Sequence, residues 1–348
     1  RLYLNADPGR RHGKLRDDSY EGIQKRLIDA WVSSGEMREL TSRMFLLGGR
    51  EYPIRLEFFK FKDPAASIQL EWKPPHGVWS VIDAESLSTA SVARTFVVDT
   101  PFPADDHSVG YERGSSVSQE WHDAVANAAL ATSAEVASRL PLLTGIQGDF
   151  KHARARLAIF LMRFASTAFR RPLTVAEQQL YRETLFEGSA PEVAVRRGVL
   201  LVLTSPNFLY TNLPSEDQQP NRHELAARLA FALWDSLPDE ELRRLADLER
   251  LATPAQVESQ AARMLRDPLT RFKLHGFFRH WLELEERDLA KDQKMYPDFD
   301  ETVIADLRRS LELFVDQVVW SPASDYRELL LADYLLLNDR LQQLYADA

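Results

Sequence analysis

The spacing of hydrophobic residues changes part-way along this chain, and that change limits the fold more than any other feature of the sequence. Between residues 52 and 58 every second residue is apolar: Tyr52, Ile54, Leu56 and Phe58. A period of two is typical of a β-strand that buries one face. From about residue 118 onward, apolar residues recur every three or four positions, as in an amphipathic helix. The sequence therefore predicts an α+β, multidomain chain, with a partial N-terminal antiparallel β-sandwich followed by mainly α-helical domains.

The strand pattern occurs twice in the N-terminal part. Residues 68–72 repeat the alternation, and the intervening residues 62–67 carry the Asp-Pro and Ser of a turn. We expect the two runs to form an antiparallel hairpin. The alternation also predicts that Tyr52 and Trp72 pack in a core with the apolar face.

Helix starts are marked by capping signals in the second part. Residues 174–177, 189–192 and 253–256 each fit the capping box, in which Ser or Thr caps the helix and Glu or Gln returns the bond. Asp267 followed by Pro268 predicts a further helix start. The longest predicted helix has its apolar stripe over residues 303–318 and ends before the Ser-Pro pair that follows.

Two irregular segments divide the chain. The segment 213–221 is polar and flanked by proline, and the longer segment around 93–117 contains Pro, Gly and acidic residues without periodicity. These segments predict four parts: a partial β-sandwich, a connector with a helix, a small helical domain and a larger helical domain, over residues 1–92, 93–148, 149–213 and 214–348. Because the chain begins at Arg1 and not at Met, we expect it to be a piece of a longer protein.

Composition excludes several classes of function. The 348 residues carry 43 Lys and Arg against 52 Asp and Glu, a net charge of −9, whereas a nucleic-acid binder needs a basic surface. There is no cysteine, which excludes disulfides, thiolate nucleophiles, cysteine zinc sites and covalent haem attachment in this segment. No apolar run approaches the roughly 20 residues of a membrane-spanning helix. We expect no nucleic-acid partner and no membrane span here.

The histidines and acidic pairs are the obvious candidates for a metal or an acid–base site. His275 and His280 are five residues apart, which separates them by roughly 140° around a helix, a poor geometry for sharing one ion. Two loops gather hard ligands: Asp17 and Asp18 in one, and the stretch 105–107 (Asp-Asp-His) in the other. Calcium needs six to eight oxygen ligands, so a pair of aspartates supplies only part of a shell. We interpret these residues as structural or solvated, and expect no metal site.

Other conspicuous residues also have structural explanations. The acidic run 283–288 could hold paired carboxylates for glycoside hydrolysis, but resembles an ordinary charged helix end. Trp234 shares a helix face with leucines, which predicts a place in the core. Arg170 and Arg171 could bind an anion, although the helix dipole alone explains arginine near a helix C-terminus. The nucleophile elbow, the phosphate-binding loop and the dinucleotide fingerprint are absent, so no residue is assigned a catalytic role.

Several stretches together resemble known families. The runs AFRRPLT at 168–174 and TSPNFLY at 204–210 are similar to a small helical domain of unknown function (DUF-1595 type) from planctomycete proteins. Two further runs resemble its companion domain (DUF-1592 type): ELAARLAFALWDSLPDEEL at 224–242 and ADYLLLNDRL at 332–341. The strand-rich part is similar to the C-terminal portion of a protective-antigen-type (PA-14) β-domain, through the runs GREYPIRLEF and QLEW that begin at Gly49 and Gln69.

The resemblance implies a function but no reaction. Such chains are extracytoplasmic, periplasmic or in the cell envelope, and usually carry c-type cytochrome modules. Because this segment holds no cofactor site, any haem c lies elsewhere in the full-length protein. The resemblance implies partners as well: a cell-surface or polysaccharide glycan at the β-domain, and attached or neighbouring cytochrome modules. Some sugar-binding relatives use a paired-aspartate calcium loop, which makes Asp17 and Asp18 the candidate carbohydrate or calcium ligands.

Two functions remain open from the sequence. The first is a non-catalytic segment of a modular protein, with a glycan-binding-like β-domain and helical scaffold domains. The alternative is a polysaccharide-acting or redox enzyme with a site at the β/α domain interface. A shallow β face with exposed aromatic residues and a filled helical core would favour binding, whereas a pocket with two carboxylates at glycosidase separation would favour the enzyme.

Overall fold

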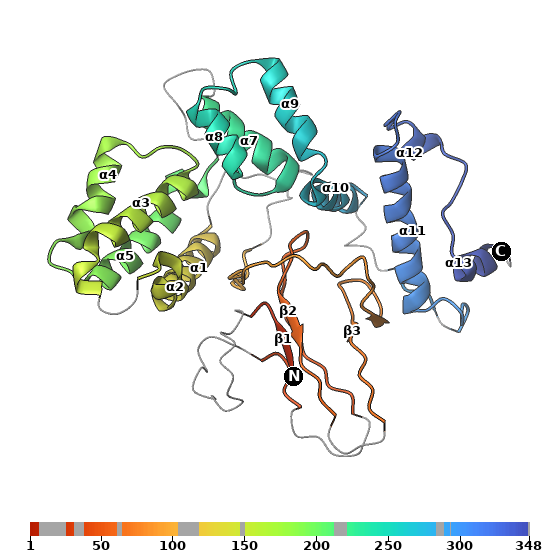
Figure 1. The fold of residues 1–348 in the computed structure, drawn as a ribbon. Coiled ribbons are helices and arrows are strands. Elements are labelled where there is room, and N and C mark those ends of the chain that lie inside the picture. Colours follow the sequence, from red (N-terminus) through yellow and green to blue (C-terminus); the bar gives the residue numbers. More distant parts are fainter. Residues whose placement is uncertain are drawn as a thin grey trace. The chain divides into compact units, whose positions relative to one another are not determined.

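The computed structural model describes residues 1–6, 26–30, 38–60, 65–103, 118–146, 150–211, 221–282, 289–292 and 294–346 (Figure 1). The chain forms two compact units. One contains all four described strands and the C-terminal helices, and comprises Arg1–Ser42, Glu51–Arg94 and Leu274–Ala348. The other contains the remaining helices and comprises Arg43–Arg50 and Thr95–Lys273. The predicted α+β class, with few antiparallel strands before a mainly helical part, is confirmed.

The strands form two small antiparallel sheets. Strand β1 (Leu2–Leu4) pairs with β2 (Ile54–Leu56), placing Tyr3 opposite Arg55. Strand β3 (Glu71–Trp72) pairs with β4 (Ser80–Val81). The predicted hairpin between residues 52–58 and 68–72 is therefore wrong for the described strands. A strand can pair with a segment far away in the sequence, as β2 does with β1, and the alternation of apolar residues alone does not specify its partner.

The predicted burial of the apolar face of β2 is also wrong. Ile54, Leu56 and Phe58 are 40%, 40% and 50% exposed. On the opposite face, the guanidinium of Arg55 lies 4.1 Å from the centroid of the buried Tyr3 ring. This contact is a cation–π interaction, which holds the arginine side of the strand against β1. Trp72 is 39% exposed, so its expected place in a core is not found either.

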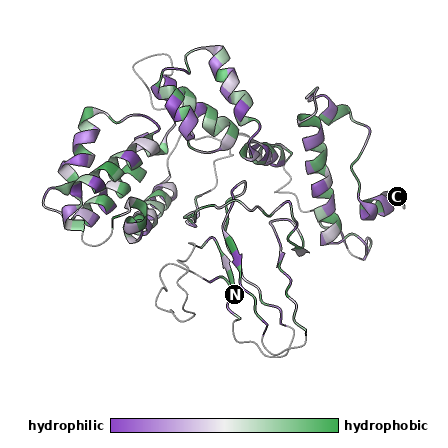
Figure 2. Cartoon of the chain, viewed as in Figure 1, coloured by the Kyte–Doolittle hydropathy of each residue, from purple (hydrophilic) through white to green (hydrophobic). Residues whose placement is uncertain are grey.

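The principal helical core is built on two helices that cross closely. Helix α3 (Arg154–Phe169) packs against α5 (Pro191–Leu203), and α5 also packs against α1 (Gln119–Ser138). Figure 2 shows hydrophobic and hydrophilic residues alternating along these helices, as in amphipathic helices. The largest fully buried side chains come from α2 (Leu140–Thr144), α3 and α5: Leu140, Leu157, Leu161, Val195, Val199 and Val202.

Short elements complete this part of the unit. They are η1 (Phe150–His152), α4 (Val175–Arg182), η2 (Thr184–Phe186) and α6 (Pro206–Leu209). Tyr181 of α4 and Phe186 of η2 are both buried against the same core. The small elements therefore close the bundle around α3 and α5.

A second core lies among three further helices of the same unit. They are α7 (Arg222–Trp234), α8 (Glu240–Asp247) and α9 (Pro254–Met264). Trp234 is 6% exposed, and its indole Nε1 donates a hydrogen bond to the carbonyl of Met264 at 3.1 Å. The prediction that Trp234 belongs to a core is confirmed.

The C-terminal helices continue the chain. Helix α10 (Pro268–Trp281) is followed by α11 (Glu301–Val319), α12 (Glu328–Leu331) and α13 (Asp339–Ala346). Helix α11 covers the predicted range and ends two residues before Ser321. Its residues Val303, Val315 and Val318 are buried. In the unit that contains them, α12 and α13 both pack against α11.

Helix capping confirms most of the local predictions. Complete capping boxes form at Thr174 with Glu177 and at Thr253 with Gln256, and Asp267 accepts from the amide of Leu269 at 2.9 Å. The box predicted at residues 189–192 is wrong. Helix α5 begins at Pro191 with Ala190 as its N-cap.

Proline at the first helical position explains the shift. Its fixed φ angle suits that position, which moves the cap to Ala190, one residue beyond the serine. The Ser189 hydroxyl is then too far back to cap. It accepts instead from the guanidinium of Arg197 at 3.1 Å.

Gly198 lets α3 and α5 approach each other, and this gives a test of the core. A Cβ at Gly198 would lie 2.7 Å from Cδ1 of Leu161, whereas a Cβ at Gly276 of α10 would meet nothing within 4 Å. We expect G198A to lower the free energy of unfolding by about 1–3 kcal/mol through overpacking. We expect the matched G276A to raise it by roughly 0.5–1 kcal/mol through helix propensity. Urea denaturation measures both, and equal effects of the two substitutions would refute the close approach.

Candidate functional site

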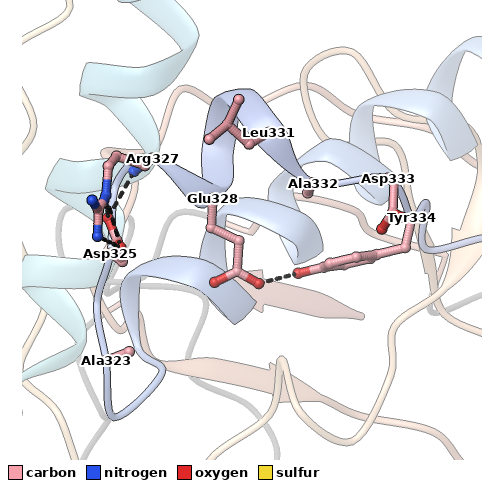
Figure 3. Close-up of a pocket in the computed structure, with 8 residues that line it drawn as sticks. All are labelled: Ala323, Asp325, Arg327, Glu328, Leu331, Ala332, Asp333 and Tyr334. Atoms are coloured by element: carbon pink, nitrogen blue, oxygen red, sulfur yellow. Dashed lines mark hydrogen bonds and ion pairs between the residues drawn. The ribbon is translucent and has the colours of Figure 1, made fainter.

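One hollow in the described residues lies beside α12. It has a volume of about 490 Å³ and is widely open to solvent. Figure 3 shows the side chains that line it. Its lining comes from α12 and the loops on either side: Ala323, Asp325, Arg327, Glu328, Leu331, Ala332, Asp333 and Tyr334. A hollow of this size fits the range of small-ligand and side-chain sites. It is therefore the candidate site with the clearest geometry.

Tyr334 forms one wall of the hollow and is held from two sides. Its hydroxyl donates to Oε1 of Glu328 at 3.0 Å, as Figure 3 shows, and its ring meets Phe314 of α11 edge-on at 5.6 Å. Loss of hydration, followed by the hydrogen bond to Glu328, raises the pKa of the Tyr334 phenol. The phenol is therefore a neutral hydrogen-bonding group near neutral pH.

The charge of the hollow is negative. The Nε of Arg327 donates to both carboxylate oxygens of Asp325, at 2.9 and 3.0 Å, which neutralises that pair. Within the described part of the chain, the Asp333 carboxylate has neither an ion pair nor a hydrogen bond, and the Glu328 carboxylate bonds only to Tyr334. Two carboxylates thus remain without a cation. The arrangement suits a positively charged group.

The histidines of α10 have structural roles or no shared target. The Nε2 of His275 lies 2.9 Å from Oδ1 of Asp316, and the indole Nε1 of Trp320 donates to the same oxygen at 3.1 Å. The imidazole is 13% exposed, so this network ties α10 to α11. The described residues contain no cluster of three or more His, Asp or Glu that could hold a metal ion. Neither His275 nor His280 therefore belongs to such a cluster.

Some sequence candidates lie outside the described residues. These are the predicted carbohydrate or calcium ligands Asp17 and Asp18, the Asp-Asp-His stretch 105–107, and the acidic run 283–288. Two tryptophans of the strand-rich part, in contrast, are described. Trp79 is 53% exposed and Trp72 39% exposed, and both belong to the β3–β4 hairpin, where Trp72 pairs with Ser80. The hairpin therefore presents indole rings to solvent.

Arg170 does not form an anion site. Its guanidinium is bonded to backbone carbonyls of the protein, and we refer to this set of bonds as the Arg170 tie. It ends α3 in the left-handed conformation, with φ of 60°, and is 8% exposed. Its guanidinium donates to the carbonyls of Phe208, Asn207 and Tyr210 at 3.0, 2.6 and 2.9 Å. A fourth bond goes to the carbonyl of Ala168 at 3.1 Å. Burial lowers the pKa of this guanidinium, and all four bonds from its two terminal nitrogens go to backbone oxygens.

Arg171 has a different partner. Its two terminal nitrogens donate to the two carboxylate oxygens of Glu177, each at 2.8 Å. Glu177 is also the acceptor that closes the capping box with Thr174. The bond from Arg171, the largest effect, lowers the pKa of Glu177 below its ordinary value of about 4.5. Neither arginine of the pair is thus left for an anion.

The two helical regions match known family models. Residues 156–212 match the model described as PSD5, a protein of unknown function (DUF1595), and residues 221–346 match PSD4, a protein of unknown function (DUF1592). The helical part of the chain contains these two domains. The predicted resemblance to these two helical families is therefore confirmed. No curated protein and no solved structure matches the chain.

The matched regions contain the main polar arrangements. Arg170 and its carbonyl partners lie in the PSD5 region, and the hollow beside α12 lies in the PSD4 region. Sequence reasoning did not identify the hollow as a site. The only signal in the sequence was that residues 332–341 belong to the family-like run. The spacing of the acidic residues in that run does not indicate a shared pocket. No helix in the described ranges has both the length and the apolar character needed to cross a bilayer.

The tie made by Arg170 predicts a large effect on stability. Replacing Arg170 by Met keeps the aliphatic stem but removes all four donated bonds, leaving partly buried carbonyls without a donor. We expect R170M to lower the free energy of unfolding by about 3 kcal/mol or more, measured by urea denaturation. The matched control is R163M, at an exposed arginine of the same helix, and it should change stability by less than about 0.5 kcal/mol. Wild-type stability of R170M would contradict the tie.

Proposed function

We propose that this chain is a non-catalytic segment of an extracytoplasmic modular protein. In this proposal the PSD5 and PSD4 regions form a helical scaffold that serves c-type cytochrome modules elsewhere in the full-length protein. The β part contacts a cell-surface or polysaccharide glycan. The proposal rests on how the conspicuous polar and aromatic residues are used.

The observation that carries the scaffold is the Arg170 tie. It joins the end of α3 to α6, and its guanidinium also lies 5.7 Å from the centroid of the Phe231 ring of α7. Arg243 of α8 adds a hydrogen bond to the hydroxyl of Thr167 at 3.3 Å. These contacts connect the PSD5 region to the first helices of the PSD4 region within one compact unit. Specific side-chain contacts that join two domains are what a scaffold needs.

The use of other charged residues supports the same interpretation. Arg263 donates to both oxygens of Asp239, the N-cap of α8, at 2.8 and 3.3 Å. His275 and Trp320 share Asp316. In each case a side chain able to do chemistry instead positions a helix. Such bonds favour a structural role over a catalytic one.

The glycan part of the proposal is supported by the exposed indoles of the β3–β4 hairpin. Aromatic rings combine an apolar face with a polar edge, which suits contact with sugar rings. Trp79 at 53% exposure and Trp72 at 39% exposure provide such faces within one hairpin, where Trp79 directly precedes Ser80, the pairing partner of Trp72. The helical core, by contrast, is filled with fully buried aliphatic side chains. Exposed aromatics on the strands together with a filled helical core favour binding over a buried active site.

The glycan contact is tested with the full chain on a glycan array, with and without calcium. We expect binding that W72A/W79A weakens about tenfold or more, because truncating a stacked indole removes a large contact area. The matched control is W281A, since Trp281 is also 55% exposed but lies in the PSD4 region. D17N/D18N tests the calcium loop. Absence of binding to every glycan, or an equal loss with W281A, would eliminate this part of the proposal.

The cytochrome association and the location are tested on the full-length protein. Because this chain has no cysteine, covalent haem c requires residues outside it. We expect the full-length protein to fractionate with the cell envelope and to retain haem after denaturing electrophoresis. The readouts are a haem stain and the absorbance of reduced c-type haem. A cytoplasmic, haem-free full-length protein would contradict the association and the location while leaving the array result to stand alone.

A further inference from the structure

The hollow beside α12 is bordered by unusually exposed apolar side chains. Tyr326, Leu330 and Leu331 are 72%, 72% and 78% exposed, and they lie in and next to the four residues of α12. We refer to these three residues, together with Glu328 and Asp333 of the hollow, as the α12 face. Exposed leucines and a tyrosine grouped at a hollow are the usual surface of a protein interaction site.

The charge of the α12 face determines what can cover it. Oε2 of Glu328 and both oxygens of Asp333 have no hydrogen bond or ion pair within the described ranges, and the only cation in the lining, Arg327, is engaged by Asp325. A neutral apolar partner would remove water from these carboxylates without replacing its hydrogen bonds, which is costly. A partner with lysine or arginine beside apolar residues satisfies both requirements.

We propose that the α12 face docks a basic amphipathic segment of a partner protein. A lysine or arginine of that segment enters the hollow and pairs with Glu328 and Asp333. Its apolar side chains cover Tyr326, Leu330 and Leu331. The docking site lies in the PSD4 region and goes beyond the proposed function, because it requires neither a glycan nor haem.

The side chains of Glu328 and Tyr334 in the hollow are already held in place by neighbouring residues. The hydroxyl of Tyr334 holds one oxygen of Glu328, which orients the carboxylate, and Phe314 supports the tyrosine ring. Figure 3 shows Glu328 reaching from α12 toward Tyr334, with the Asp325–Arg327 pair at the other side. Preorganised groups lose less entropy on binding.

A second copy of this chain fits the face less well than a basic partner. A symmetric pairing of two α12 faces would bring Glu328 and Asp333 close to their own copies, and like charges at short range repel. The chain as a whole also carries a net charge of −9. A small organic cation would satisfy the carboxylates but leave the three large apolar side chains in water.

The test uses the full chain and a dye-labelled amphipathic Lys/Leu peptide, with a Glu/Leu peptide of equal length as the ligand control. Binding is followed by fluorescence polarisation at low and physiological salt. We expect E328Q/D333N to weaken binding of the Lys/Leu peptide by about tenfold or more, and L330N/L331N to weaken it similarly. The matched charge control is E240Q/E258Q, which removes two exposed carboxylates from α8 and α9. Urea denaturation verifies that all variants remain folded.

The outcomes separate the occupants. Loss of binding with E328Q/D333N and L330N/L331N, but not with E240Q/E258Q, supports the proposal. Three results overturn it: no binding by wild type, equal weakening by the charge control, or equal binding of the Glu/Leu peptide. Self-association of the chain that L330N/L331N abolishes, measured by analytical ultracentrifugation, also overturns it, because the occupant would then be a second copy.

Discussion

The helical part of this protein depends on one arginine. Arg170 ends α3 in a left-handed conformation, and its side chain is buried. Its guanidinium donates to four backbone carbonyls, three of them in and after α6. Carbonyls at a helix end have no intrahelical donor, so one planar group with five N–H donors satisfies several of them together. The same side chain lies near Phe231, which extends the joint from the PSD5 region into the PSD4 region.

The protein uses its charged residues in two different ways. Around α3, α4 and α8, arginines are paired in forks with Glu177 or Asp239, or are bonded to backbone oxygens, and they position helices. Around α12, Glu328 and Asp333 keep oxygens without a cation beside exposed leucines. The first arrangement is complete within the described part of the chain, whereas the second leaves carboxylate oxygens for the basic partner that we propose. The bonds that position helices and the face proposed for docking therefore lie in different elements.

The sequence predictions were confirmed mainly where the interacting residues are close together in the sequence. The capping box at Thr174 and Glu177 was predictable because both partners lie within one helical turn. The box at Ser189 failed because Pro191 favoured a start one residue later, a preference that the motif alone does not weigh. Burial of Trp234 followed from helical spacing. The pairing of β1 with β2 and the exposure of Ile54 depend on contacts between distant segments, which periodicity does not encode. The hollow at Tyr334 is formed within residues 323–334, but by irregular backbone around α12, which has no periodic pattern.

The sequence by itself determined the change from strands to helices, the helix starts at Thr174, Thr253 and Asp267, the absence of cysteine chemistry and the identity of the two helical domains. These properties depend on residue type and on neighbours within about one helical turn. Only the tertiary structure decided that Arg170 binds carbonyls and not an anion, that Asp316 serves both His275 and Trp320, and that Glu328 and Asp333 share a hollow. The reason is that the partner of a polar side chain is selected by the packing of whole elements, and burial then makes an unpaired group costly.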